Sequence, residues 1–546
     1  MKLNFSISKH KLSLWKEKLE AIPLDKLIVP LAILFAVIAT YLSYTNDRII
    51  TYGDAESHLN IAKRIIHSIT SGFAQMGGIW LPIPHLMMVP FVYFDTLWRT
   101  GLAGSIVSGF SYVISSIFVY RTFYYLTKHK LSSFIAFMVF ALNLNVLYMQ
   151  STPMTELPLI MFFMVSSYFF IKFIKNPQDA ISLIFAALFG FLASLSRYDG
   201  WFLVIFEAMI VVLIHFPLKA TIEALKKKNL KWLFKNFQTA EGQVVMFATL
   251  AFFGILLWLI WGYLILGDPF YFTNSSFSAK SQQQSWLARG ELPAYKHILM
   301  ALGYYAVTVL SNAGILPFLI ALLGFITYAF HKADKHRFYI MIMFSVPFVF
   351  NVYTMFVGQS VIFIPHITPT TFEWTLFNVR YGIMMIPTVA FFVAFLFMNS
   401  KVTGRVVIVT LLLFQLFLYT VGYSRIITLA DGSVGLSRAK RPDAEFWIKE
   451  HYDYGIVLLD DYARTVSIVR SGFKMQDIIY IGNKPYWEES LVQPDKYARW
   501  IIMQKNDTVW RNLLDNPKTQ GRLYKYFEKA YTSPEILIFK RKENVK

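Results

Sequence analysis

Long apolar runs alternate with short polar segments between positions 1 and 422 of the chain. Most runs approach the roughly 20 apolar residues that a helix needs to cross a lipid bilayer. The runs lie at 27–44, 102–126, 131–149, 157–174, 180–196, 201–216, 244–266, 311–330, 338–357, 381–398 and 405–422. The pattern therefore predicts an α-helical polytopic membrane protein with about eleven transmembrane helices.

Two apolar segments fit this pattern poorly. Residues 79–94 contain Pro82, Pro84 and Pro90, and each proline removes a backbone donor that lipid cannot replace. We predict that this segment is an interfacial or re-entrant element on the outer face. The segment 295–310 is similarly ambiguous, and one reading places it along the outer surface before the next crossing.

The pattern changes near 422–442, where apolar runs give way to mixed sequence. Segments that resemble short strands are 455–460, 477–481 and 536–539, and segments that resemble helical pieces are 444–450 and 497–503. The predicted units are a cytoplasmic N-terminal segment at 1–26, a transmembrane domain at 27–422 with a first outer loop at 45–101, and a small soluble α/β domain at 423–546 outside the membrane.

Composition supports this division and excludes several classes of site. The 546 residues are 56% apolar and 16% charged, whereas about a quarter of the residues of a soluble domain are charged. The chain has no cysteine, which excludes disulfides, thiolate metal sites and cysteine nucleophiles.

The formal net charge of +19 is explained by topology. The part of the chain before position 423 holds 31 of the 52 Lys and Arg side chains, and 22 of these 31 lie in the N-terminal segment and in five loops on one predicted side. The positive-inside rule makes that side the cytoplasm, so the C-terminal domain is expected to be extracytoplasmic. We predict a multi-pass protein, in the plasma membrane if the source is prokaryotic, with no nucleic-acid partner.

The strongest chemical motif is Tyr-Gly-Asp-Ala-Glu-Ser-His at 52–58, just after the first crossing. If a helix begins near Gly53, Asp54 and His58 share one face while Glu56 points elsewhere. A carboxylate there can accept the proton of a hydroxyl or help to hold a divalent cation. The alternative is that Asp54 caps the helix and Glu56 is merely solvated.

Two tight outer turns carry further charges. Glu156 lies in the turn at 153–158, on the same predicted side as Asp54, and is either functional or a capping acid. Arg197 and Asp199 lie in the turn at 196–201 and either face a ligand or pair with each other.

Arg380 and Tyr381 enter a late crossing from the outer side. A charge at that depth is a functional hypothesis by default, and the guanidinium fork suits a phosphate. The alternatives are an ion pair with a nearby acid or an extended conformation that reaches the interface. Lys280 is an isolated cation in the long outer loop 267–298.

Together these motifs resemble the GT-C superfamily of membrane glycosyltransferases. The likeness lies in the acidic Asp54-Ala55-Glu56 after the first crossing, the proline-interrupted element 78–86, the acidic turn Met154-Thr155-Glu156, and Arg380-Tyr381 before a late crossing. The most similar branch contains the protein O-mannosyltransferases and the lipid A aminoarabinose transferases, including prokaryotic members. Two departures leave the sugar and the acceptor open: the acidic motif is Asp-x-Glu rather than Asp-Glu, and no Trp-Trp-Asp run occurs.

The resemblance implies transfer of a sugar, with inversion, from a polyprenyl-phosphate-linked donor to a hydroxyl of a protein, lipid or glycan on the extracytoplasmic face. It implies that Asp54 is the general base and that Arg380 stabilises the leaving phosphate. Glu156 would orient the acceptor, or would hold a divalent metal ion with Asp54 and Glu56; the sequence leaves the cofactor open. The candidate substrate-binding residues are His58, Arg197, Asp199, Lys280, Arg380 and Tyr381.

The rival class is a polytopic transporter or flippase of lipid-linked saccharides. Such a protein places ionisable residues near the bilayer midplane and often has internal repeats. Here Glu207 is the main intramembrane acid, and the chain shows no tandem repeat. The residues alone indicate an outer-surface site for an anionic lipid, and the resemblance to the GT-C superfamily makes a transferase the favoured interpretation.

Overall fold

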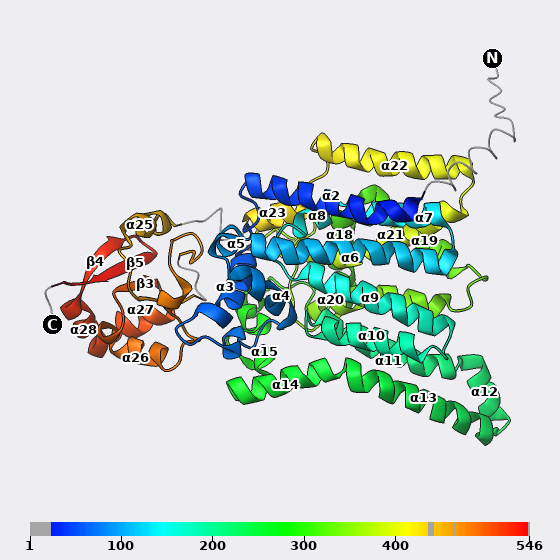
Figure 1. The fold of residues 1–546 in the computed structure, drawn as a ribbon, viewed down its shortest axis with the longest axis horizontal. Coiled ribbons are helices and arrows are strands. Elements are labelled where there is room, and N and C mark those ends of the chain that lie inside the picture. The colour runs from blue at the N-terminus through cyan, green and yellow to red at the C-terminus, as the bar shows by residue number, and fades with distance from the viewer. Residues whose placement is uncertain (1–22, 435–441, 462–465, 544–546) are drawn as a thin grey trace, which may run out of the picture.

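The computed structural model describes residues 23–434, 442–461 and 466–543. Figure 1 shows a bundle of long helices with a smaller α/β unit at one end. Most of the predicted N-terminal segment (residues 1–22) lies outside the described residues, and so does part of the predicted domain boundary (residues 435–441).

Six described helices are long and apolar enough to cross a membrane. They are α2 (Leu24–Thr45), α6 (Leu102–Thr127), α9 (Glu156–Lys175), α20 (Arg337–Phe356), the continuous Val379–Asn399, which consists of η2 (Val379–Met385) and α21 (Ile386–Asn399), and α22 (Val402–Thr420). Three bent pairs raise the number to at most nine. These pairs are α11 (Asp199–His215) with α12 (Leu218–Lys226), α13 (Leu230–Ala251) with α14 (Phe253–Leu266), and α18 (Ile298–Ala313) with α19 (Ile315–Ala329).

These numbers confirm a polytopic helical protein but fall below the eleven crossings predicted. The segment 131–149 is split into α7 (Lys130–Ala141) and α8 (Leu144–Met149), and 180–196 is the 15-residue α10 (Ala180–Ser194). Helix α7 has only 12 residues, too few to span the hydrocarbon core of a bilayer as one straight helix. Hydropathy does not detect the break between α7 and α8, where the Asn143 side chain caps α8 by accepting from the Val146 amide.

A sharp bend separates α18 from α19. Their axes differ by 116°, and Gly314 between them has φ +86°, with Gln415 so close that a Cβ would lie 2.7 Å from its side chain. Glycine both adopts this backbone conformation and leaves the space. Most of the segment 295–310, whose position the sequence left ambiguous, belongs to α18. This helix packs against η2.

The first outer loop forms three α-helices at the end of the bundle that faces the α/β unit (Figure 1). They are α3 (Gly53–His67), α4 (Ile83–Val92) and α5 (Asp95–Thr100). Helix α4 has only 10 residues, and Pro84 lies in its first turn, where an absent N–H costs little. The proline-rich segment is thus too short to be a crossing.

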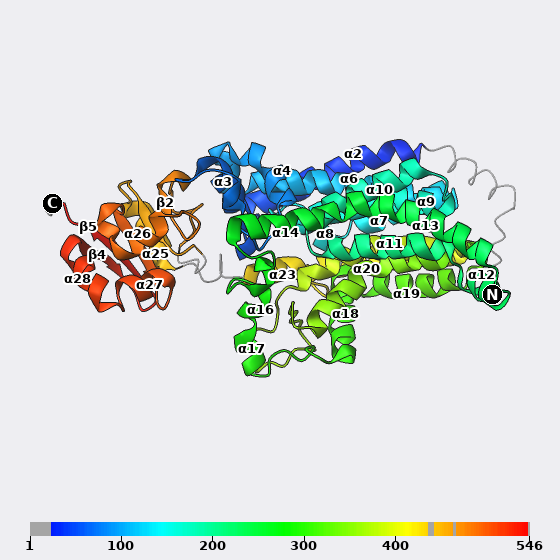
Figure 2. The ribbon, with the colours of Figure 1, turned by 90° about the horizontal axis from the view of Figure 1, so that it is seen from below.

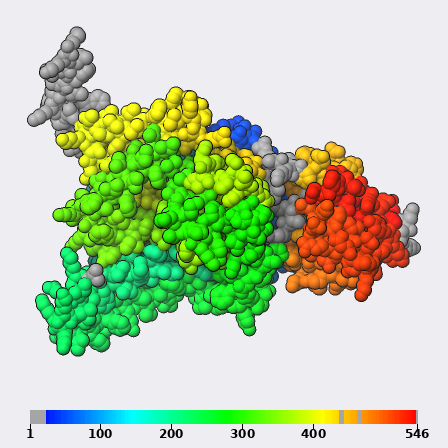
Figure 3. Space-filling model, turned by 180° about the vertical axis from the view of Figure 1, so that it is seen from behind, coloured from blue at the N-terminus to red at the C-terminus, as the bar shows by residue number. Residues whose placement is uncertain are grey.

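The C-terminal unit contains a five-stranded mixed sheet of order β2-β1-β3-β5-β4. The strands are β1 (Val457–Leu459), β2 (Ile478–Ile479), β3 (Trp500–Gln504), β4 (Phe527–Thr532) and β5 (Ile536–Arg541). Strand β1 is parallel to both of its neighbours, whereas β5 is antiparallel to β3 and β4. The unit confirms the predicted small α/β domain, and Figure 3 shows it as a lobe in orange and red beside the helices.

One predicted helix in this unit is wrong. Residues 497–503, read as a helical piece, end in the central strand β3, where Ile501 and Ile502 are fully buried. A strand buried on both faces carries a continuous apolar run without alternation, and such a run cannot be distinguished from a buried helix by periodicity.

Candidate active site

Arg380 joins two predicted site residues that are distant in sequence. Its Nη2 donates to Asp54 Oδ2 at 2.8 Å, and its Nε donates to Glu156 Oε1 at 3.2 Å. The Glu156 side chain is 0% exposed, whereas that of Asp54 is 31% exposed. Glu156 is therefore a fixed internal counter-ion, and Asp54 is the partner that an incoming ligand can reach.

Arg197 extends this network on the other side of Glu156. Its Nη1 donates to Glu156 Oε1 at 3.1 Å and to Thr155 Oγ1 at 3.0 Å, and its Nε lies 3.4 Å from Asp199 Oδ2. The Arg197–Asp199 pair considered from the sequence is thus formed, but as part of a larger cluster. Pairing of this kind is needed because an isolated buried charge costs several kcal/mol.

The three acids share a local feature that explains their placement. Asp54, Glu156 and Asp199 each lie in the first turn of a helix, namely α3, α9 and α11. A carboxylate there is stabilised by the positive end of the helix dipole. Asp54 does not cap α3, since the N-cap residue is Tyr52 and its side chain forms no capping hydrogen bond.

Aromatic rings flank the guanidinium of Arg380. The ring centroids of Tyr52 and Tyr381 both lie 5.1 Å from it, and Tyr381 is also 5.1 Å from the guanidinium of Arg197. Such contacts add cation–π attraction and hold the planar group in place. Burial raises the pKa of Tyr52 well above its usual value, so its hydroxyl stays protonated and donates to Thr428 O at 2.6 Å.

His58 lies one turn after Asp54 on α3, as the helix start near Gly53 predicts. Its Nδ1 is 2.9 Å from Nε2 of His85, whose Nδ1 lies 3.0 Å from Leu81 O. Because a carbonyl only accepts, His85 donates to Leu81 and accepts from His58. Burial lowers the pKa of His58 well below its usual value and that of His85 to about 4. Both rings are therefore neutral at physiological pH, and the pair fastens α3 to α4.

Glu56 lies outside the arginine cluster. Its Oε1 accepts from the Val469 amide at 3.3 Å, and burial raises its pKa above the usual value. Arg64, further along α3, donates to Asp461 Oδ2 at 2.5 Å, so this part of α3 is bound to the C-terminal unit. Asp54, Glu56 and Glu156 accordingly do not meet as a metal-binding group, and the described residues contain no cluster of three His, Asp or Glu side chains suited to a metal ion.

For the sugar transfer that the sequence resemblance implies, this placement predicts that Glu56→Gln retains activity, because Gln keeps an oxygen that can accept from the Val469 amide. Folding raises the pKa of Glu56. The native protein should therefore lose stability relative to the variant as the pH rises from below about 4.5 through the folded-state pKa. Thermal unfolding of both proteins across this pH range measures the difference. A loss of transfer as severe as that from an Asp54 variant would instead place Glu56 in the chemistry.

Lys280 is not brought to the cluster by any contact of the described residues. It lies in α16 (Ala279–Gln282) and is exposed. Figure 2 shows that α16 and α17 (Gln284–Ala288) stand out from the side of the bundle.

The structure adds one acid that the sequence did not single out. Asp431 lies in α23 (Ile427–Val434), which follows the last long helix and packs against α8 and η2. Its carboxylate is buried, and Oδ2 lies 3.4 Å from the Tyr52 hydroxyl. The sequence analysis assigned all residues after 422 to a soluble domain and therefore did not consider Asp431 as a site residue. Its position shortly after the last predicted crossing was the available signal.

An apolar crevice begins beside the cluster and runs between α9, α20 and α21. Among the described residues that line it, only Asp199 is ionisable. The remaining lining residues are Leu159, Ile160, Phe163, Phe344, Pro347, Met384, Pro387 and Thr388. Apolar side chains thus lie directly beside Asp199, one acid of the cluster.

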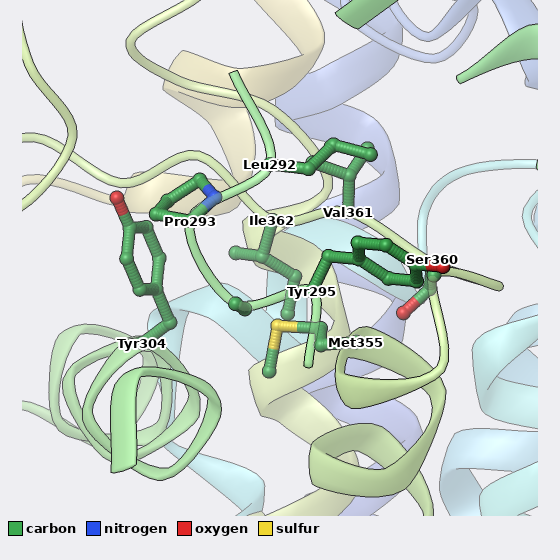
Figure 4. A pocket seen from close by; sticks show the side chains of 10 residues that line it. Leu292, Pro293, Tyr295, Tyr304, Met355, Ser360, Val361 and Ile362 are labelled. Atoms are coloured by element: carbon green, nitrogen blue, oxygen red, sulfur yellow. The ribbon is translucent and has the colours of Figure 1, made fainter. Parts of the chain in front are cut away.

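A second pocket has a different character. Figure 4 shows it between the segment before α18, Tyr304 of α18 and the end of α20 at Met355. The segment before α18 contributes Leu292, Pro293 and Tyr295, and the lining within the described part of the chain includes no Asp, Glu, Lys, Arg or His. It therefore lacks the groups that would hold a phosphate.

The bundle of long apolar helices, the helices that follow its first long helix and the small mixed α/β C-terminal unit together resemble the folds of solved membrane proteins. Specifically, the chain has a fold like that of ArnT from Cupriavidus metallidurans. The structure of that protein bound to undecaprenyl phosphate matches with a TM-score of 0.53 and 10% sequence identity, over 94% of this chain and 98% of that one. Its apo state matches with a TM-score of 0.50 and 11% identity, over 94% and 97% of the two chains.

A more distant match is the archaeal oligosaccharyltransferase AglB from Archaeoglobus fulgidus, in complex with an inhibitory peptide and a dolichol-phosphate. Its TM-score is 0.47 at 10% identity, over 96% of this chain and 75% of that one. No protein-family model and no curated protein sequence matches the chain.

Proposed function

We propose that this protein is an integral-membrane glycosyltransferase that moves a sugar from a polyprenyl-phosphate-linked donor to an acceptor hydroxyl. The observation that carries the proposal is the network Glu156–Arg380–Asp54, with its exposed carboxylate, beside an apolar crevice. A lipid phosphate has the matching chemistry of an anionic head on an apolar chain. ArnT, the fold relative, was solved with undecaprenyl phosphate.

In the proposed reaction, Asp54 is the general base. It takes the proton of the acceptor hydroxyl as the acceptor oxygen attacks the anomeric carbon. A new carbon–oxygen bond forms while the bond to the phosphate oxygen breaks, and the electron pair leaves with the phosphate. Attack from the face opposite the leaving group inverts the anomeric centre. Arg380 stabilises the charge that develops on the phosphate.

The contacts of Arg380 suggest how the donor prepares the base. Asp54 holds the Nη2 edge of the guanidinium, which is the edge that a phosphate would take. Glu156 is buried on the Nε side and stays in place. We expect the donor phosphate to displace Asp54, so that its carboxylate becomes available to the acceptor only when the donor is bound.

The remaining site residues hold this arrangement. Glu156 orients both arginines, and Tyr381 lies against both guanidinium groups. Asp199 holds Arg197 from the side of the crevice.

The proposed location follows from the distribution of charge. The lysine-rich α12 and the start of α13 lie at the end of the bundle opposite the α/β unit (Figure 1). Under the positive-inside rule this end is cytoplasmic. The arginine cluster and the C-terminal unit would then be extracytoplasmic, at the plasma membrane if the source is prokaryotic.

A transporter of lipid-linked saccharides is the second candidate, because one acid is buried within the bundle. Glu207 of α11 is fully buried and accepts from Ser166 Oγ at 2.9 Å. Ionisable residues at membrane depth are typical of transport pathways.

A single reconstitution distinguishes the two candidates. The full chain is placed in liposomes with an undecaprenyl-phosphate-linked sugar labelled on the sugar, together with a panel of hydroxyl acceptors. Transfer of label to an acceptor, with release of undecaprenyl phosphate, supports the transferase. Movement of intact donor across the bilayer without cleavage would support the transporter and contradict the proposal.

A further inference from the structure

Helix α23 brings a third part of the chain to the arginine cluster. It follows α22 and belongs to neither the first outer loop, which carries Asp54, nor η2, which carries Arg380. Its buried face contains Thr428, Asp431 and Gly432. This face meets both of the elements that supply the proposed base and the proposed phosphate ligand.

The contacts of Asp431 connect these two elements directly. Its carboxylate lies close enough to Arg380 for the guanidinium and the backbone N–H of that residue to favour its ionised form, and Oδ2 lies 3.4 Å from the hydroxyl of Tyr52. Tyr52 is the N-cap residue of α3, two positions before Asp54, and its ring flanks the Arg380 guanidinium. One side chain thus contacts the start of α3 and the start of η2 together.

A chain of buried amides anchors α23 in this position. The Thr428 amide donates to Asn145 Oδ1 at 3.0 Å, and Asn145 Nδ2 donates to Asn312 O at 2.9 Å. Asn312 Nδ2 in turn donates to Val379 O at 2.7 Å, next to Arg380. Because these groups are fully or nearly fully buried, each hydrogen bond is costly to break.

Close packing leaves α23 little room to move. A Cβ on Gly432 would lie 2.9 Å from Thr51 Oγ1 and 3.0 Å from the Tyr52 ring. The absence of a side chain at Gly432 therefore lets α23 approach the segment before α3 closely enough for Asp431 to reach Tyr52.

We propose that Asp431 is a positioning residue, which fixes the start of α3 and the start of η2 relative to each other through its contacts with Tyr52 and the Arg380 backbone. It acts through these contacts and does not touch the substrate. The inference rests on the proposed function for its consequence in transfer, but its primary readout is phosphate binding, which does not require turnover.

Asp431 could affect phosphate binding through its contacts or through its negative charge, and the two mechanisms predict opposite effects of its substitution. The groups that face Asp431 are Arg380, Tyr52 and Asp54. If Asp431 acted mainly through its negative charge, removing the charge would favour a phosphate near Arg380. If it acts through contacts, Asp431→Ala weakens binding, whereas Asp431→Asn retains an acceptor oxygen and restores it.

The experiment measures binding of undecaprenyl phosphate to the full chain in nanodiscs. We expect Asp431→Ala to weaken binding by about tenfold, the scale of one hydrogen bond near a charged group. Asp431→Asn should restore binding to within about twofold of the native protein. Ser433→Ala, on the exposed face of the same helix, is the matched control and should bind as the native protein does.

The pH dependence of phosphate binding separates the contacts of Asp431 from its charge. Burial raises the pKa of Asp431 to about 6, so the native side chain carries its charge above this pH and the Asn variant never does. Under the contact mechanism, the binding curves of the two proteins coincide on both sides of this pH. A divergence above this pH would show that the charge acts, and would overturn the inference.

A second variant guards against misfolding of Asp431→Ala. Tyr52→Phe removes the hydroxyl that contacts both Thr428 O and Asp431, and the double variant Tyr52→Phe/Asp431→Ala should lose less binding than the sum of the two single losses, because the two changes share one contact. Additive losses, or native binding by Asp431→Ala, would refute the positioning role. If the native protein binds undecaprenyl phosphate but transfers no sugar, the proposed function fails while this series still decides the inference.

Discussion

Asp54→Asn is expected to reduce sugar transfer by at least about 100-fold, the lower range for removal of a general base. The same substitution should tighten the binding of undecaprenyl phosphate. Asp54 occupies the Nη2 edge of Arg380 in the ligand-free structure, and its charge repels an incoming phosphate. Asn is a weaker competitor for that edge and carries no charge. Transfer is measured with a labelled donor, and binding is measured by titration in nanodiscs.

The opposite signs of these two effects make the prediction specific. A variant that simply unfolds would lose both binding and transfer. Asp47→Asn is the matched control, since Asp47 is an exposed acid of the same loop. Its positive φ of 52° is one that Asn tolerates well. Full transfer by Asp54→Asn would show that another group is the base, and weaker binding would contradict the exchange between Asp54 and the donor phosphate.

The sequence located most of the cluster because its acids occupy recognisable local positions. Asp54, Glu156 and Asp199 each begin a helix after an outer turn, so turn signals and hydropathy together place them at the same end of the bundle. Arg380 follows the same logic at the start of η2. The predicted membrane crossings thus constrain which residues, distant in sequence, lie at the same end of the bundle. The sequence of a soluble protein provides no such constraint.

The sequence could not give the partners of these residues. Glu56 is two positions from Asp54, yet it faces the C-terminal unit, because successive positions on a helix point in different directions around its axis. Lys280 lies on the correct predicted side, but its helix stands out from the bundle. Asp431 joins the cluster only because the chain returns to it after the last long helix, and no local pattern encodes such a return.

Contacts that hydropathy does not register explain the errors in the fold. The split of 131–149 depends on the local cap that Asn143 provides for α8. Strand β3 depends on its neighbours on both edges of the sheet. These strand pairings are tertiary contacts, and they override an apolar run whose composition alone fits a helix.

Arg380→Ala is expected to have the second large effect, on both activity and folding. Removal of the group that stabilises the leaving phosphate should cost about 100-fold or more in transfer. It also leaves a buried carboxylate short of one partner, which costs about 3 kcal/mol. This is the lower end of the usual range, because Arg197 still pairs with Glu156. Thermal unfolding and transfer with a labelled donor measure the two losses separately.

Arg380→Lys separates charge from geometry. A lysine retains the positive charge but lacks the guanidinium fork, which holds Glu156 through Nε and leaves Nη2 for a second anion. We therefore expect most of the stability to return while transfer stays low. Arg289→Ala is the control. Arg289 forms ion pairs with Glu291 and Glu373 away from the arginine cluster, and its substitution should change neither stability nor transfer measurably. Full transfer by Arg380→Lys would mean that a point charge suffices to stabilise the phosphate. The hydrogen bonds of the guanidinium to Glu156 and Asp54 would then contribute only to the stability of the fold.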